Sequence, residues 1–293
     1  MAATADPALS TSLTPSDRVA VIAGGGELPR ELVRGLTAAG HAPFVVIVGD
    51  EDPSGLTGGE YTVLHVEEYG RLLPVLRAAR ATHVVMAGSV SRRPRLRAIR
   101  FSVGLLKLLP QIVWALGRGD DALLRTIVGH IEAAGMKVLG SHQILPDLLA
   151  DKGALTRVRP SASIQPGIAA AFQAARAIGA LDIGQAAVAV GRRVVALEGV
   201  EGTAAMLARV GDLRASGRIS MAGGVLVKCA KPGQELRADL PTIGPDTVVD
   251  AHAAGLSGIA VEAGRTIILR QGDVVENADR LGLFVVGLDG SGR

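Results

Sequence analysis

A polar stretch broken by glycine and proline runs from Lys228 to Gly244, with the sequence KCAKPGQELRADLPTIG. It places the cations of Lys228, Lys231 and Arg237 beside the carboxylate of Asp239. Cations placed in advance stabilise phosphoryl oxygens, and a neighbouring carboxylate can hold a divalent metal ion or orient water. The stretch therefore predicts an anion-binding site with Asp239 as its reactive carboxylate. The alternative is a solvated loop whose ion pairs contribute about 0–1 kcal/mol each.

Residues on both sides of this stretch extend the candidate site. The run Pro-Thr-Ile-Gly-Pro that follows Asp239 is stiff, and the hydroxyl of Thr242 and the amides ahead of the next helix add hydrogen-bond donors. Glu198 and Glu201 leave a predicted strand just before a helix, which Thr203 is expected to cap. We therefore take these side chains as candidate neighbours of Asp239.

Two glycine turns follow predicted strands in the N-terminal half. They contain Gly24, Gly25 and Gly26, and Gly88 and Ser89. The first turn lies between the apolar strand RVAVIA and a helix over residues 28–39, and the strand APFVVIVGD follows, which predicts a right-handed βαβ unit. Ligands bind at the carboxyl ends of strands in such sheets, and helix N-termini bind phosphate. We favour a contact between the first turn and a phosphate or nucleotide. The alternative that the turn binds no ligand stays open. A nicotinamide cofactor is disfavoured because the sequence GGG departs from the G-x-G-x-x-G fingerprint.

The block GRGDDALLR introduces a helix expected over residues 121–134 and a strand expected over residues 137–139. Asp120 and Asp121 stand at the start of this helix, where an acid caps the helix or stabilises its first turn. The functional alternative is that one of them holds a metal ion or a sugar hydroxyl.

A basic block without acids precedes this helix. It consists of Arg92, Arg93, Arg95, Arg97, Arg100 and Lys107. The block overlaps the apolar run VGLLKLLPQIVWAL, which is shorter than the ~20 residues that a membrane span needs. Two interpretations stay open: a buried core helix with a solvated basic flank, or an interfacial segment that meets anionic lipid.

The 293 residues, 48% of them apolar, suffice for one large or two medium α/β domains. We predict a disordered tail over residues 1–17, an N-terminal domain with a Rossmann-like parallel sheet over 18–145, a proline-containing linker over 146–166, and a C-terminal α/β domain over 167–293. This last domain is expected to begin with the helix GIAAAFQAARAIGALD. It continues with the strands of QAAVAVGRRVVALEG, which form a hairpin around a Gly-Arg turn.

Composition excludes several classes of protein. A net charge of +3 and an aromatic content of 2% argue against a nucleic-acid binder, because stacking platforms are missing. The single cysteine, Cys229, excludes an internal disulfide and a cysteine-based zinc cluster. The N-terminal residues contain neither the charged segment nor the apolar core of a signal peptide.

Several long blocks occur in order from about Val19 to Asp289. They are IAGGGELP, AGSVSRRP, GRGDDALLR, LDIGQAAV, EGTAAML and LVKCAKPGQELRADLPTIG. In these blocks the chain resembles the UDP-2,3-diacylglucosamine pyrophosphatases of the LpxI family; the second block differs from the form AGSVSRP by an additional arginine.

The resemblance implies two α/β domains with the substrate held between them. It implies hydrolysis of UDP-2,3-diacylglucosamine to 2,3-diacylglucosamine 1-phosphate (lipid X) and UMP, with Mg²⁺, in lipid A biosynthesis. The expected location is cytoplasmic and peripheral to the inner membrane of a Gram-negative cell. Expected partners are this substrate and the membrane surface, with a homodimer as a candidate assembly.

The resemblance also assigns residues. Its key acid lies in the motif Asp-Leu-Pro-Thr-Ile-Gly, which makes Asp239 the expected catalytic residue and a candidate metal ligand. The candidates for substrate contact, from the resemblance and the charge pattern together, are Gly24, Gly25, Gly26, Gly88, Ser89, Asp120, Asp121, Thr203, Lys228, Lys231, Gln234 and Thr242.

Two other functions stay open at this point. One is another enzyme that binds a nucleotide-sugar or nucleotide-lipid through the N-terminal glycine turn, including a transferase or an oxidoreductase. The other is a lipid carrier without enzymatic activity, in which the charged stretch is a surface loop.

Overall fold

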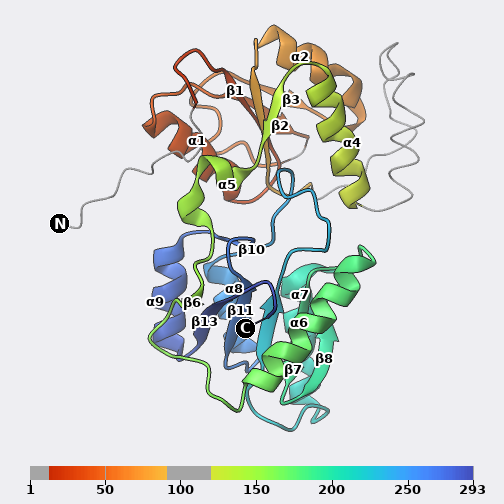
Figure 1. Ribbon diagram of the computed structural model, residues 1–293, viewed down its shortest axis with the longest axis vertical. Helices are drawn as coiled ribbons and strands as arrows, with labels where there is room; N and C mark the ends of the chain where they lie inside the picture. Colours follow the sequence, from red (N-terminus) through yellow and green to blue (C-terminus); the bar gives the residue numbers. More distant parts are fainter. Residues whose placement is uncertain (1–12, 50, 91–119, 293) are drawn as a thin grey trace, which may run out of the picture. The chain divides into compact units, whose positions relative to one another are not determined.

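The computed structural model describes residues 13–49, 51–90 and 120–292, and its contacts divide the chain into two compact units (Figure 1). Unit 1 comprises Met1–Asp147 together with Glu235–Asp239, and unit 2 comprises Leu148–Gln234 together with Leu240–Arg293. A short piece of the C-terminal half of the chain therefore belongs to unit 1, and this piece contains the predicted reactive carboxylate.

Unit 1 is built around a five-stranded sheet in the order β3-β2-β1-β4-β5, in which every neighbouring pair is parallel. Its strands are β1 (Val19–Ala23), β2 (Phe44–Val48), β3 (Tyr61–Leu64), β4 (His83–Ala87) and β5 (Lys137–Leu139). Short apolar runs such as VAVIA suit strands that are covered on both faces. The predicted Rossmann-like parallel sheet is confirmed, and its strand order reverses between β1 and β4.

Helices follow the strands of this sheet. They are α1 (Leu28–Ala38), η1 (Val66–Arg71), α2 (Leu72–Ala78), α4 (Asp120–Ala133) and α5 (Ser141–Ile144). Helix α1 carries a proline in its first turn, and Gly40, which has φ 83°, follows its C-cap residue Ala39. The amide of His41 donates to the carbonyl of Leu36 (2.9 Å) and that of Gly40 to Thr37 (3.0 Å), which satisfies the last carbonyls of the helix.

Unit 2 contains a six-stranded mixed sheet in the order β6-β13-β11-β9-β7-β8 and a parallel pair, β10 and β12. The strands β9, β11 and β13 are parallel, whereas β6, β7 and β8 join antiparallel. The strands are β6 (Gly153–Ala154), β7 (Ala186–Val190), β8 (Arg193–Leu197), β9 (Val225–Lys228), β10 (Thr242–Ile243), β11 (Gly258–Glu262), β12 (Ile267–Ile268) and β13 (Phe284–Leu288). The predicted hairpin is confirmed as β7 and β8.

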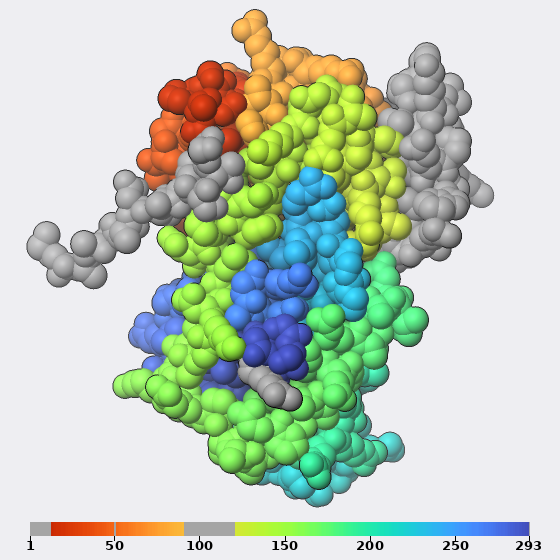
Figure 2. All heavy atoms as spheres, viewed as in Figure 1, coloured from red at the N-terminus to blue at the C-terminus, as the bar shows by residue number. Residues whose placement is uncertain are grey.

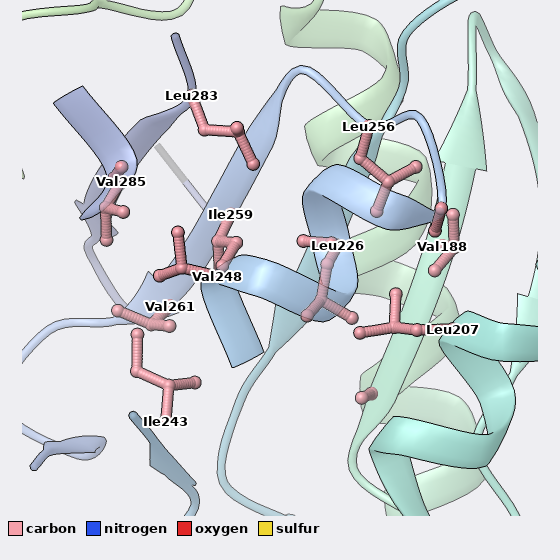
Figure 3. Close-up of a cluster of buried hydrophobic side chains, with 14 of the residues drawn as sticks. Val188, Leu207, Leu226, Ile243, Val248, Leu256, Ile259, Val261, Leu283 and Val285 are labelled. Atoms are coloured by element: carbon pink, nitrogen blue, oxygen red, sulfur yellow. The ribbon is translucent and has the colours of Figure 1, made fainter. Parts of the chain in front are cut away.

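The helices of unit 2 are α6 (Gln165–Ala180), α7 (Gly202–Ala215), α8 (Pro245–Ala253) and α9 (Gln271–Leu281), and η3 (Pro146–Leu148) lies at the boundary of the units. Aliphatic side chains make the core, as the low aromatic content requires. Figure 3 shows Leu226 and Ile259 of the sheet beside Val248 of α8 and Leu207 of α7, all fully buried. Burying one such side chain contributes about 1.5–3 kcal/mol.

Within residues 146–166, expected as a linker, the structure describes η3, β6 and the first residues of α6, and the two residues of β6 pair with β13. The prediction that Thr203 caps a helix is wrong: α7 begins at Gly202, its N-cap residue is Glu201, and no side chain caps it.

The basic block from Arg92 to Lys107 and the whole apolar run that overlaps it lie outside the described residues, as does the predicted tail up to residue 12. Among the helices that the structure does describe, none has the length and apolar character to span a bilayer.

Cys229 directly follows β9 and is buried, and burial, followed by the nearby negative charge of Glu262, raises the pKa of its thiol to about 12. Because the thiolate is the nucleophile, we expect native protein at pH 8 to resist iodoacetamide. Mass spectrometry should find stoichiometric alkylation only after unfolding in urea. Rapid labelling of the native protein would show that this strand end opens readily.

Candidate active site

The glycine turns after β1 and β4 lie side by side. The amide of Gly25 donates to the carbonyl of Ser89 (2.7 Å), and the amide of Ser89 donates back to Gly25 (3.0 Å). A Cβ atom on Gly24 would lie 2.4 Å from the Ser89 carbonyl oxygen, and one on Gly88 would lie 2.4 Å from that of Gly25. Both positions therefore require glycine for backbone packing, whether or not a ligand binds.

This pair of turns stands where the strand order reverses, which is the usual ligand position in open α/β sheets. Gly26 has φ 96°, and an added Cβ atom would meet nothing within 4 Å. Helix α1 begins two residues later without a side chain that caps it. An uncapped helix start can bind an anion, but the Glu51 carboxylate already lies close to Gly25, where an added Cβ atom would be 2.3 Å from its Oε2. The role of Gly24, Gly25, Gly26, Gly88 and Ser89 in substrate binding stays a prediction.

Lys228 ends β9 and is buried in unit 2. Its Nζ donates to the hydroxyl of Thr203 and to the backbone carbonyl of Thr242, each at 3.0 Å. The hydroxyl of Thr203 in turn donates to the buried carboxylate of Glu198, whose other oxygen accepts the amide of Gln185 (2.9 Å). The structure thus brings together the predicted residues Lys228, Thr203 and Thr242 in a network that balances a buried cation with a buried anion.

Lys231 and Gln234 shape the loop that leaves β9. The side-chain oxygen of Gln234 accepts the amide of Lys231 (2.9 Å), and Nζ of Lys231 pairs with the carboxylate of Asp182. Asp182 has φ 55° and follows the end of α6, where its amide donates to Gly179 (3.0 Å). Both predicted residues therefore have structural partners within unit 2.

The segment Glu235–Asp239 is a single turn in which the amides of Ala238 and Asp239 donate to the carbonyl of Glu235 at 2.9 and 3.1 Å. It belongs to unit 1, and Ala238 packs against that unit's hydrophobic core. Figure 2 shows the light-blue atoms of this part of the chain against the yellow-green atoms of α4. Asp121 of α4 accepts the amide of Glu235 (2.8 Å). Asp120 begins α4, and its side chain lies outside the described part.

Arg237 makes a two-pronged contact with its neighbour Glu235, with Nε and Nη2 donating at 2.8 and 2.9 Å. Its Nη1 also donates to Glu132 of α4 (2.6 Å). These hydrogen bonds raise the pKa of Arg237, the contact with Glu235 contributing most, and lower the pKa of Glu235. Arg237 was expected to offer its charge to an anion, and in the structure two carboxylates of the protein already engage it.

Asp239 offers carboxylate oxygens, the donor type that Mg²⁺ prefers. The described part of the chain contains no group of three or more His, Cys, Asp or Glu side chains that could hold a metal ion. Mg²⁺ commonly uses one or two carboxylates together with the phosphates of a substrate. Asp239 therefore fits an ion that is shared with a phosphate of the substrate.

Sequence reasoning missed several partners in these contacts. Glu262 ends β11 with a fully buried carboxylate that accepts the amide of Ala230 (3.0 Å) and fixes the turn after Lys228. Glu132 and Asp182 are also absent from the predicted set. A glutamate at the end of the apolar strand GIAVE is a signal that could have drawn attention to Glu262. Glu132 carries no such signal, because its partner is distant in sequence.

Two family models and one curated protein match most of this chain. Residues 18–148 match the LpxI N-terminal domain family, and residues 151–286 match the LpxI C-terminal domain family. A Caulobacter vibrioides protein named UDP-2,3-diacylglucosamine pyrophosphatase LpxI is 41% identical over 274 residues, which cover 93% of this chain and 98% of that protein.

Similarity to solved structures is much weaker. A putative epimerase from Burkholderia cenocepacia is 14% identical with a TM-score of 0.32, over 94% of this chain and 84% of that one. The Bordetella bronchiseptica enzyme WbmG, in complex with NAD and UDP, is 18% identical with a TM-score of 0.27, over 41% of this chain and 34% of that one. Values this low support no argument about fold or function.

The two sheets and their flanking helices define an α/β protein of two units, the first with a doubly wound parallel sheet. The family matches cover nearly all of the described residues. The chain belongs to the LpxI family.

Proposed function

We propose that this protein hydrolyses the pyrophosphate bond of UDP-2,3-diacylglucosamine, with UMP and 2,3-diacylglucosamine 1-phosphate as products. The observation that carries the proposal is the 41% identity, over 93% of this chain, to a protein named for that pyrophosphatase activity. Asp239 lies in the motif DLPTIG, which the resemblance to this family marks as the position of its key acid.

The reaction consumes one water molecule. The water oxygen bonds to one phosphorus, the bond from that phosphorus to the bridging oxygen breaks, and the released proton leaves with the products. The chain's own contribution in this proposal is to orient the diphosphate and to hold negative charge at Asp239 beside it. Lys228 and Lys231 belong to the same stretch of sequence and would add positive charge, but within unit 2 Lys231 pairs with Asp182 and Lys228 donates to Thr203 and Thr242. The amides of the glycine turns would supply neutral donors.

Mg²⁺ belongs to the same proposal, with Asp239 as the residue that would hold it. When bound, such an ion neutralises charge on phosphate oxygens. Four further points stay predictions. They are association with the inner-membrane surface through the basic block from Arg92 to Lys107, a role in lipid A biosynthesis, a homodimeric assembly, and substrate binding between the domains.

Two alternatives make different predictions. The place of the glycine turns at the reversal of strand order is compatible with another enzyme that binds a nucleotide-sugar or nucleotide-lipid. A redox enzyme of this kind would copurify with a nicotinamide or flavin chromophore. A lipid carrier would bind the substrate without consuming it.

The test is product formation by the purified chain. Incubated with UDP-2,3-diacylglucosamine and Mg²⁺, it should release UMP and the lipid phosphate in equal amounts, as measured by liquid chromatography and mass spectrometry. Chelation of divalent ions should stop the reaction, and UDP-N-acetylglucosamine should react poorly because it lacks the acyl chains. Absence of UMP under these conditions would refute the proposal.

A further inference from the structure

We propose that Asp121, Glu132 and Arg237 are positioning residues that fasten the segment Glu235–Asp239 to helix α4 and thereby hold the Asp239 carboxylate in place. The consequence for turnover rests on the proposed hydrolysis. The fastening itself is a property of the fold and can be measured without substrate.

Helix α4 presents a stripe of side chains toward this segment. Asp121, Arg125, Val128 and Glu132 follow one another at intervals of four, three and four residues, which places them on one face of a helix. Val128 is buried in the core cluster against which Ala238 packs. The stripe therefore combines apolar contact in its middle with polar groups at both ends.

The two ends of the stripe hold different parts of the segment. Near the start of α4, Oδ1 of Asp121 accepts the amide of Glu235 (2.8 Å), while its Oδ2 pairs with Arg125. Near the end of α4, Glu132 pairs with Arg237 (2.6 Å). The anchors are 11 residues apart on the helix, which corresponds to about 16 Å. Because the segment is fixed at two separated points, it cannot pivot about either.

The backbone of the segment is also in close contact with the turn after β5. A Cβ atom on Gly140 would lie 3.2 Å from Cα of Arg237. Glu235 completes the arrangement, because its carboxylate receives two hydrogen bonds from Arg237 and orients the guanidinium toward Glu132. Asp239 is two residues further on, at the end of the turn whose amides donate to Glu235.

Two residues that the sequence predicts as ligand contacts have a structural role in this proposal. Asp121, a predicted substrate contact, uses both carboxylate oxygens within the protein, and Arg237, a predicted phosphate cation, is shared by two glutamates. Their effect on turnover would then act through the position of Asp239. A displacement of about 1 Å at a reacting group can cost about 100-fold in rate.

The first experiment compares Asp121→Ala with Asp121→Asn. Asparagine keeps an oxygen that can accept the amide of Glu235, whereas alanine removes it. We expect Asp121→Ala to lower kcat by about 10- to 100-fold with little change in KM, and Asp121→Asn to recover most of that loss. If Asp121 bound substrate or metal directly, both variants would lose activity alike and KM would rise. That pattern would overturn the assignment.

The second experiment uses Arg237→Gln, with Glu60→Gln as its matched control. Glu60 pairs with Arg18 at the amino end of β1, at the edge of the sheet opposite the glycine turns, so its loss breaks an ion pair of the same unit at a distance. Hydrogen exchange is followed on the peptide that contains residues 235–240. We expect faster exchange at Ala238 and Asp239 in Arg237→Gln only, together with the loss of kcat.

The outcomes separate the two proposals. Unchanged exchange and unchanged kcat in Arg237→Gln would refute the positioning role while leaving the hydrolysis intact. A wild-type protein that releases no UMP would refute the hydrolysis, and exchange would still decide whether α4 fastens the segment. A fall in kcat that Glu60→Gln shares would mean a general loss of stability and would also count against positioning.

Discussion

Asp239→Asn is expected to lower kcat for UMP release by about 10²- to 10⁴-fold, the contribution typical of a positioned acid–base group. The substitution keeps the size of the side chain and removes its negative charge, which weakens both proton acceptance and metal binding. The turn itself should persist, because the amides of Ala238 and Asp239 donate to the backbone carbonyl of Glu235. Initial rates, together with substrate binding by titration, measure the effect on each step.

Asp212→Asn is the matched control for this variant. Asp212 is an exposed aspartate on α7. Because substitutions at exposed positions usually have small effects, the same chemical change there should leave kcat within about twofold of the wild-type value. Full turnover by Asp239→Asn would remove the central residue of the proposed reaction. If both variants bind the substrate equally and neither they nor the wild type form product, a lipid carrier would be favoured.

The repeating units of the fold are predictable from local sequence. Apolar runs such as FVVIV predict β2, and the pair of runs around Gly191 and Arg192 predicts the hairpin of β7 and β8. Strand β6 is not predictable in this way, because Gly153 and Ala154 have no strand pattern and pair only through β13, more than a hundred residues later. Its register comes from tertiary contact, which propensity does not contain.

The contacts of the candidate site are even less predictable from local sequence than strand β6. The types of residue between Lys228 and Gly244 indicate an anion site, and the family motif selects Asp239. Which cations remain for a ligand depends on partners far along the chain: Asp121 meets Glu235 across 114 positions, and Glu132 meets Arg237 across 105. The sequence of a charged loop therefore does not reveal whether its arginine binds a ligand or pairs with a neighbouring helix.

Gly88→Ala is expected to destabilise unit 1 by about 2–5 kcal/mol. Gly88 has φ 85°, where a residue with a Cβ atom costs about 1–2 kcal/mol. The added atom would also lie 2.4 Å from the carbonyl oxygen of Gly25 and 2.8 Å from the carbonyl carbon of Gly24. Overpacking against backbone adds about 1–3 kcal/mol. Because the two turns must then separate, the site at the reversal of strand order should also lose affinity for the diphosphate, seen as a higher KM.

Gly40→Ala isolates the contribution of the clash. Gly40 has φ 83°, nearly the same backbone conformation, and an added Cβ atom there would meet nothing within 4 Å. Stability is measured for both variants as the midpoint of urea unfolding and as hydrogen exchange over β1 and β4. The difference in stability between the two variants therefore reports on the contact of the glycine turns alone. Equal destabilisation by the two variants would show that the turns move apart at little cost. In that case their close contact could not define a preformed phosphate site.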